Sequence, residues 1–173
     1  LQSAKNTRGT TINNLRTILD SCPGINLVFK NKFWFVDISE DCYCDYHSVQ
    51  GYLDSFSNDS YSLDELGVAL PKFLKILKGG RLFSSSSDSW LDPFIEKFSN
   101  QIIDQCLLFT EKFDFHSHGD LVFLLTEVIC IYDDLNEQAN RLKLQVLIHQ
   151  GKLSLAYTTY DNFVKLYHTI YNV

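Results

Sequence analysis

The chain has 173 residues, of which 45% are hydrophobic and 21% are charged, and its formal net charge is −6. This composition is ordinary for a globular protein, and no apolar run approaches the roughly 20 residues that a membrane-spanning helix needs. The sequence contains no methionine and begins without a signal-peptide pattern, so we expect a cytoplasmic fragment whose native start lies upstream. The odd number of cysteines, five, favours reduced thiols over a disulfide framework.

Charge is unevenly distributed along the chain. Residues 1–40 carry five basic and three acidic side chains, a net charge of +2, whereas residues 41–173 carry ten and eighteen, a net charge of −8. An acidic body repels phosphates, so this distribution is compatible with a nucleic-acid contact at the N-terminal end only.

The first predicted element is a helix at residues 10–19. Its apolar residues recur at the spacing of one helical face: Ile12, Leu15, Ile18 and Leu19. The Cys-Pro-Gly sequence at 22–24 closes the helix, and Gly9 argues against a start as early as Lys5.

A β-hairpin is predicted at residues 25–38. Two runs rich in β-branched and aromatic residues flank the short polar sequence at 30–32. Asn31 is expected in the turn, because asparagine tolerates a positive φ.

From residue 45 onward the hydrophobic pattern is helical. We expect six helices, near residues 45–56, 63–78, 90–114, 119–133, 136–150 and 152–170, separated by polar or glycine-containing breaks. The third of these carries a wide apolar stripe that should face the core: Trp90, Leu91, Phe94, Ile95, Phe98, Ile102, Cys106 and Phe109.

The last four predicted helices form two antiparallel pairs of roughly 35 residues each, the scale of a helical-repeat module. In the final pair, Ala156 would allow close helix approach, and Tyr160 and Phe163 would fill the gap to the neighbouring pair. Asn140 stands where the tetratricopeptide pattern usually has an aromatic residue. We therefore predict a mainly α fold of tetratricopeptide-like antiparallel pairs in a right-handed superhelix, preceded by a helix and a β-hairpin.

Residues 132–160 carry a motif defined by its order and spacing. An acid-rich turn leads to Glu137 and Arg141 at a helix start, then to Gly151 in a turn, and then to Ala156 with Tyr160 four residues later. This arrangement resembles the bacterial transcriptional activator domain of the antibiotic-regulatory type of activators.

The resemblance extends upstream and covers about residues 41–170. The sequence at 78–83 and the Trp90-Leu91 pair resemble that family's glycine-containing turn, loop and tryptophan before a long helix. The chain departs from the family at Leu135, where the family often has proline before its turn. In the family, the helical domain follows a response-regulator-type winged helix. Residues 5–38 are similar to the end of one: recognition helix, short turn and hairpin wing.

The resemblance implies two domains, a truncated winged helix at 1–40 and a helical activator domain at 41–173. Long cations neutralise phosphates, and Asn or Arg side chains pair with base edges in the major groove. The residues expected to contact DNA are Lys5, Arg8, Asn13, Asn14 and Arg16, with Lys30 and Lys32 on the wing. The alternative for each residue is an ordinary solvated polar face.

Cys42, Cys44 and His47 bring metal-ligand types close together. A structural zinc site needs about four ligands, and the distant His116 and His118 belong to a polar turn, so we expect no metal and no cofactor. The sequence also lacks a nucleophile elbow and a phosphate loop. We therefore assign no catalytic residues and expect no enzymatic activity.

Four tyrosines crowd the last predicted helix and can share one side of it. Tyrosine is enriched at interface hot spots, so Tyr157, Tyr167 and Tyr171 are predicted to bind a partner. For Tyr160, packing against the preceding helix pair is favoured instead.

These features favour a fragment of a bacterial transcription regulator. Its complete winged helix would bind promoter DNA, and its helical domain would associate with itself or with other proteins, the transcription machinery among them. A homodimer is the common default, and no membrane contact is expected from this segment.

Two other hypotheses stay open. The first is a helical-repeat adaptor that binds a protein or peptide and never touches DNA. Upstream sequence would separate it from a regulator, because strands and two helices before Leu1 favour the regulator and further repeats favour the adaptor. The second is an enzyme, which only the Cys/His cluster supports.

Overall fold

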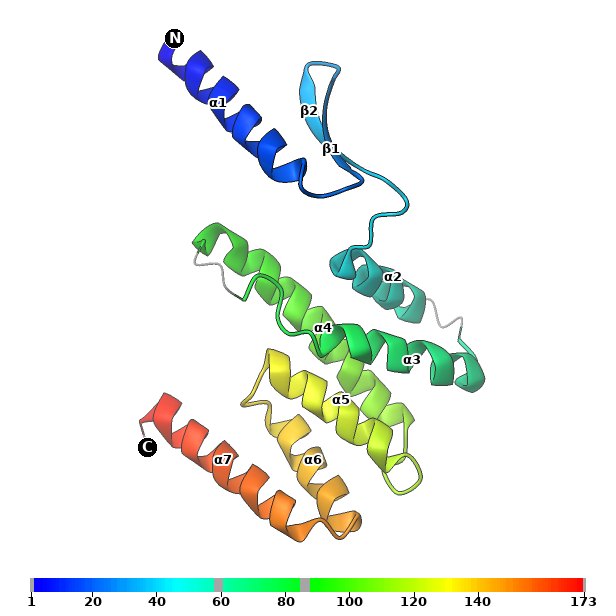
Figure 1. Ribbon diagram of the computed structural model, residues 1–173. Coiled ribbons are helices and arrows are strands. Elements are labelled where there is room, and N and C mark those ends of the chain that lie inside the picture. Colours follow the sequence, from blue (N-terminus) through cyan, green and yellow to red (C-terminus); the bar gives the residue numbers. More distant parts are fainter. Residues whose placement is uncertain (1, 58–60, 85–87, 173) are drawn as a thin grey trace. The chain divides into compact units, whose positions relative to one another are not determined.

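The computed structural model describes residues 2–57, 61–84 and 88–172, except for the side chains of residues 2–6, 63 and 64 (Figure 1). Within these ranges the chain is mainly helical, with seven α-helices and one two-stranded antiparallel sheet, which confirms the predicted mainly α class. The chain divides into two compact units, residues 1–48 and residues 49–173.

The first unit begins with α1 (Gln2–Leu19), which is eight residues longer at its start than predicted. Gly9 lies inside this helix, and a Cβ built there meets nothing within 4 Å, so no packing contact requires glycine at this position. One interior glycine costs a helix only about 1 kcal/mol, and good helix formers precede it. The predicted start at residue 10 was therefore wrong.

The hairpin consists of β1 (Ile25–Lys30) and β2 (Phe33–Ile38). The strands are antiparallel, with Lys30 opposite Phe33 next to the turn and Ile25 opposite Ile38 at the open end. Its two-residue turn places Asn31 at φ 54° and Lys32 at φ 67°. Two consecutive positive φ values match the right-handed twist of the flanking strands. The predicted hairpin and the position of Asn31 are confirmed, and Lys32 shares the left-handed conformation.

One face of the hairpin is entirely apolar. Side chains alternate between faces along a strand, so the register places six large hydrophobic residues on the same face: Ile25, Leu27, Phe29, Trp34, Val36 and Ile38. Despite this surface, no side chain among residues 7–48 is buried.

The helices from residue 45 onward are α2 (Asp45–Ser57), α3 (Leu63–Leu77), α4 (Asp92–Lys112), α5 (Gly119–Tyr132), α6 (Glu137–His149) and α7 (Leu153–Tyr171). Each end lies within two residues of its predicted position. Local hydrogen bonds account for two starts. Ser62 and Glu65 form a reciprocal capping box before α3, and the Asn136 side chain accepts the Ala139 N–H at 3.0 Å before α6.

The core of the second unit lies where α2, α3, α4 and α5 meet. The rings of Phe73 on α3 and Phe109 on α4 pack edge-on against Phe56 of α2, with centroids 5.2 and 5.0 Å apart. Consecutive helices from α4 to α7 then pack side by side (Figure 1). None of the helices in the described ranges is long and apolar enough to cross a membrane.

The predicted stripe along α4 is only partly buried. Phe98, Ile102, Cys106 and Phe109 are buried, but Trp90 is 76% exposed and Phe94 is 39% exposed. Trp90 belongs to a one-turn 3₁₀ helix, Ser89–Leu91, whose period of three residues breaks the α-helical face. The prediction that these two aromatic residues face the core was wrong.

Candidate interaction surfaces

Helix α7 has two apolar stripes, and only one of them is packed. Ala156 is its single buried residue, and half-buried Thr159, Phe163 and Leu166 follow it at helical spacing. This stripe packs against α6. The second stripe, which we call the α7 seam, recurs at alternating intervals of four and three residues: Leu153, Tyr157, Tyr160, Val164, Tyr167 and Tyr171.

The α7 seam is largely open to solvent. Tyr157 is 78% exposed, and Tyr167 and Tyr171, the other two residues predicted to bind a partner, are exposed as well. Tyr160 is 57% exposed, so the prediction that it packs against the preceding helix pair was wrong. The stripe that packs is centred one helical position away from Tyr160, on Thr159 and Phe163.

A shallow apolar groove of about 300 Å³ lies beside the first half of the seam. It is lined by Leu144 and Ile148 of α6 and by Leu153, Ala156, Tyr157 and Tyr160 of α7. The second half of the seam is a ridge instead, because the rings of Tyr167 and Tyr171 lie against each other with centroids 4.7 Å apart. The spacing of Leu153 and Val164 in the sequence could have revealed both as members of the same stripe.

In the first unit, the two arginines of α1 that are predicted to contact DNA lie on the same side of the helix. Arg8 lines an apolar groove of about 550 Å³ between α1 and the hairpin, together with Leu15, Leu27 and Trp34. The Arg16 guanidinium lies over the Trp34 ring, 5.0 Å from its centroid. Both arginines therefore lie on the side of α1 that faces the hairpin.

Asn13 and Asn14 lie elsewhere on the helix. They follow Ile12 by one and two residues, which turns them about 100° and 200° away from the groove, and both are exposed. Lys30 and Lys32 are exposed at the hairpin turn. The Lys5 side chain lies outside the described residues. The structure thus brings the two arginines together with Trp34 but leaves the two asparagines apart from them.

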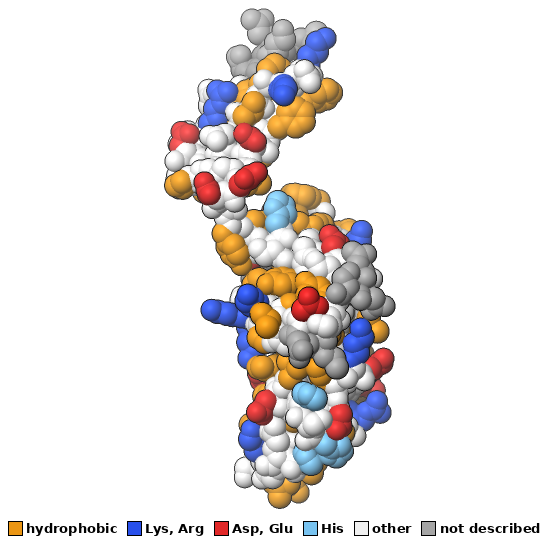
Figure 2. Space-filling view, turned by 90° about the vertical axis from the view of Figure 1, so that its right-hand side faces the viewer, with side chains coloured by type: hydrophobic (Ala, Val, Ile, Leu, Met, Phe, Trp, Pro, Cys, Tyr) orange, Lys and Arg blue, Asp and Glu red, His pale blue; other side chains and the backbone are white. Residues whose placement is uncertain are grey.

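Charge is also separated within the first unit. In Figure 2 its Lys and Arg side chains lie over the upper part of the unit, and its Asp and Glu side chains gather in the lower part. The sequence agrees with this view, because Asp20 is the only acidic residue among residues 1–36, whereas Asp37, Glu40 and Asp41 follow at the end of the hairpin.

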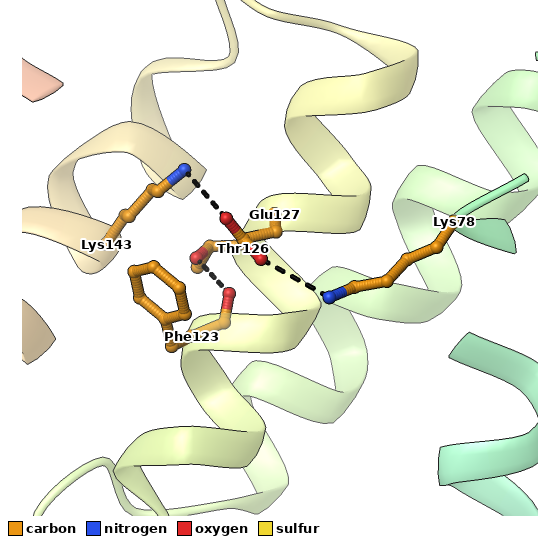
Figure 3. Close-up of polar contacts among 5 residues, drawn as sticks. All are labelled: Lys78, Phe123, Thr126, Glu127 and Lys143. Atoms are coloured by element: carbon orange, nitrogen blue, oxygen red, sulfur yellow. Dashed lines mark hydrogen bonds and ion pairs between the residues drawn. The ribbon is translucent and has the colours of Figure 1, made fainter. Parts of the chain in front are cut away.

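In the second unit, a polar contact joins three helices (Figure 3). Glu127 of α5 pairs with Lys78, the residue that caps α3, at 3.4 Å and with Lys143 of α6 at 3.6 Å. Lys143 also lies 5.3 Å from the centroid of the Phe123 ring. These side chains are satisfied by one another, and we interpret the cluster as a link between helices rather than a site for a ligand.

The cysteines and histidines do not assemble into a site. Among the described residues, no three His, Cys, Asp or Glu side chains are grouped closely enough to hold a metal ion. Burial raises the pKa of Cys106 to about 12 and also raises the pKa of Cys130, so both thiols stay protonated and are poor nucleophiles at neutral pH. His116 and His149 meet with ring centroids 4.6 Å apart, beside the exposed turns before α5 and after α6.

Comparisons with protein-family models, with curated proteins and with solved structures found no match to this chain.

Proposed function

We propose that residues 49–173 are the protein-contact module of a transcription regulator and that residues 1–48 belong to the part of the regulator that contacts DNA. The observation that supports the protein-contact role is the exposed α7 seam. It is a continuous row of large apolar and tyrosine side chains on a helix in which only Ala156 is buried. Monomeric proteins rarely expose contiguous apolar patches of this kind unless a partner covers them.

The DNA half of the proposal rests on charge and on the resemblance to a winged helix. Lys30 and Lys32 project from the tip of a hairpin, a position from which a long cation reaches a phosphate without displacing the hairpin from its helix. The strongly acidic second unit would be repelled by the same phosphates, which limits the DNA contact to the first unit.

The finer architecture belongs to the proposal as well. Consecutive packing of α4, α5, α6 and α7 is the arrangement that a tetratricopeptide-like superhelix requires. In such an array each helix pair presents an apolar face on which a neighbouring element stacks. The α7 seam has the composition of such a face.

A protein adaptor without DNA binding is the second candidate, and one observation favours it. Arg8 and Arg16, the described cations of α1, both lie toward the hairpin, and exposed Asn13 and Asn14 on the other sides carry no charge. A recognition helix in a major groove would ordinarily direct cations and amides outward together.

Fluorescence anisotropy with a labelled duplex over a series of salt concentrations tests the DNA half. We expect binding that weakens steeply with salt and a loss of about tenfold or more in the double variant Lys30→Glu with Lys32→Glu, whose salt slope should fall by about 2. The matched control, Lys72→Glu with Lys97→Glu, makes the same charge change at exposed positions of α3 and α4. No binding by the parent chain at low salt, or equal losses in both variants, would favour the adaptor.

A further inference from the structure

The α7 seam has the periodicity of a helix that packs against another helix along its whole length. Its intervals alternate between four and three residues, so the row repeats every seven residues. A seven-residue repeat keeps one apolar row facing a partner helix. A surface helix that packs on one side only needs a single stripe, and α7 already has that stripe in contact with α6. The second stripe is therefore a separate contact surface, suited to another helix.

We propose that the occupant of the α7 seam is the α7 of a second copy of this chain, packed antiparallel about a two-fold axis level with residue 162. This inference rests on the proposed role of residues 49–173 in protein contacts and names the partner. It is drawn from three features of the surface: its register, its shape and its charges.

The first feature is the register. In an antiparallel pair centred at residue 162, Leu153 opposes Tyr171 of the second copy, Tyr157 opposes Tyr167, and Tyr160 opposes Val164. All six seam positions then meet another seam position, and none faces solvent alone. Such self-complementarity is what an isologous two-fold interface requires.

The second feature is the shape. The groove lined by Ile148, Leu153 and Tyr157 lies at the first half of the seam, and the ridge of Tyr167 and Tyr171 lies at the second half. An antiparallel two-fold places each ridge into the groove of the other copy. A parallel pair would set ridge against ridge and leave both grooves empty.

The length of α7 fits the same arrangement. Helix α7 has 19 residues and its neighbour α6 has 13, so α7 is longer by about 9 Å. The part of α7 beyond the reach of α6 carries exposed Tyr167, Ile170 and Tyr171. This extension is the part of α7 that would enter the groove of the other copy.

The third feature is charge. Asp161 and Lys165 form an ion pair on one flank of the seam, with 2.6 Å between Nζ and Oδ2. Antiparallel packing brings the same flank of the two helices together. Asp161 of one copy then lies about 3 Å along the axis from the level of Lys165 of the other, so opposite charges face each other. In a parallel pair this flank would lie beside the opposite flank of the other copy, and the pairing of Asp161 with Lys165 between copies would be lost.

The area is sufficient for a stable dimer. Six large side chains on this surface are between 36% and 78% exposed: Ile148, Leu153, Tyr157, Tyr160, Tyr167 and Tyr171. At roughly 200 Å² for a large side chain they expose on the order of 700 Å² per copy, which is within the range that one partner contributes to an interface of standard size.

Sedimentation equilibrium of the whole chain from micromolar to millimolar concentration tests the proposal. We expect a monomer–dimer equilibrium that Tyr157→Glu weakens by at least tenfold, because the substitution places a charge in the interface. Asn162→Glu is the matched control, since it adds the same charge to the opposite, exposed side of α7. Circular dichroism verifies that both variants keep the helical fold, as exposure of both positions predicts.

Cross-linking tests the antiparallel register. We expect a mixture of Leu153→Cys and Tyr171→Cys copies to form a disulfide between positions 153 and 171, identified by the mass of the linked peptides apart from any native cysteine. A link between two copies of position 153 would instead show a parallel pair and overturn the register.

Three results would overturn the inference: a monomer at every concentration, a dimer that is equally stable with Tyr157→Glu, or a dimer that Phe33→Glu in the first unit abolishes instead. The proposed function fails separately. A dimer of the expected register that binds no DNA would leave the inference standing and remove the DNA half of the proposal.

Discussion

The two units of this chain use similar hydrophobic side chains in different ways. In residues 49–173, large side chains such as Phe73, Phe109 and Ile129 are fully buried between helices. In residues 7–48, the six apolar residues on one hairpin face and the apolar stripe of α1 enclose no buried side chain. One unit has a core, and the other has only apolar surfaces.

The difference lies in the number of layers. One helix beside a two-stranded hairpin makes two thin layers, and a hairpin of two strands has too little surface to stabilise itself. In the second unit α5 packs against both α4 and α6, so its side chains are covered from both sides. Hydrophobic content alone therefore does not determine which segment has a core. The number of helices or strands that pack against each apolar face determines it.

The largest expected effect tests this comparison directly. Phe109→Ala removes a ring that is 1% exposed and in contact with Phe56, so it should lower the free energy of unfolding by about 3–5 kcal/mol. Phe33→Ala removes a ring that is 67% exposed, and its effect should stay within about 0.5 kcal/mol. Urea unfolding followed by circular dichroism measures both. Equal losses would mean that the first unit has a core after all.

A smaller loss is expected where a loop is tied to the helical core. Arg81 donates hydrogen bonds to the carbonyl oxygens of Ile131 and Tyr132 at the end of α5, at 2.8 and 2.6 Å. Arg81→Leu should cost about 2 kcal/mol, because hydrogen bonds from a charged donor are lost. Arg141→Leu, at an exposed position of α6, is the control and should change the thermal midpoint little. Indistinguishable midpoints would show that the link contributes nothing.

The capping box of α3 should contribute less and should depend on pH. Ser62→Ala is expected to cost about 1 kcal/mol. Hydrogen bonds from the Ser62 N–H and hydroxyl lower the pKa of Glu65, so this carboxylate stabilises the fold at neutral pH. That stability is lost as the pH falls through the pKa of Glu65 in the folded chain. Thermal midpoints measured between neutral pH and about pH 3 should fall less in Ser62→Ala than in the parent chain; parallel curves would contradict this.

The smallest effect concerns the first unit. Arg16 over Trp34 is a partly exposed cation–π contact, which contributes about 0.5–1 kcal/mol. In a Trp90→Phe background, Arg16→Gln should shift the emission of Trp34, because the cation no longer lies over the indole ring. Asn14→Ala, which alters a side chain away from the groove, should leave the emission unchanged. A shift of the Trp34 emission with Asn14→Ala but not with Arg16→Gln would contradict the contact between Arg16 and Trp34.

Element positions could be predicted well from the sequence because they depend on local signals. The capping Ser62 and Asn136, the turn residue Asn31 and the 3.6-residue periodicity all act within a few residues. The burial of individual side chains could be predicted less well than the positions of helices and strands. Trp90 continues the apolar pattern of α4 but belongs to a 3₁₀ turn, and Tyr160 lies one helical position from the stripe that packs. Such outcomes depend on which neighbour covers a face, and periodicity does not contain that information.

The candidate surfaces illustrate the same limit. The tyrosine pattern of α7 predicted an interaction surface, and the seam that it belongs to has two further members, Leu153 and Val164, at the same spacing. On α1 the sequence predicted the same role for Arg8, Asn13 and Arg16, whereas in the structure the two arginines lie beside Trp34 of the hairpin. A contact with a distant strand determined their direction.

The most direct test of the division of roles is amide hydrogen exchange of the whole chain with and without duplex DNA at low salt. We predict that DNA slows exchange in α1 and around the hairpin turn at Asn31 and Lys32 and leaves α3 to α7 unchanged. Slower exchange confined to the helical unit, or no change anywhere at saturating DNA, would contradict the assignment of DNA contact to residues 1–48.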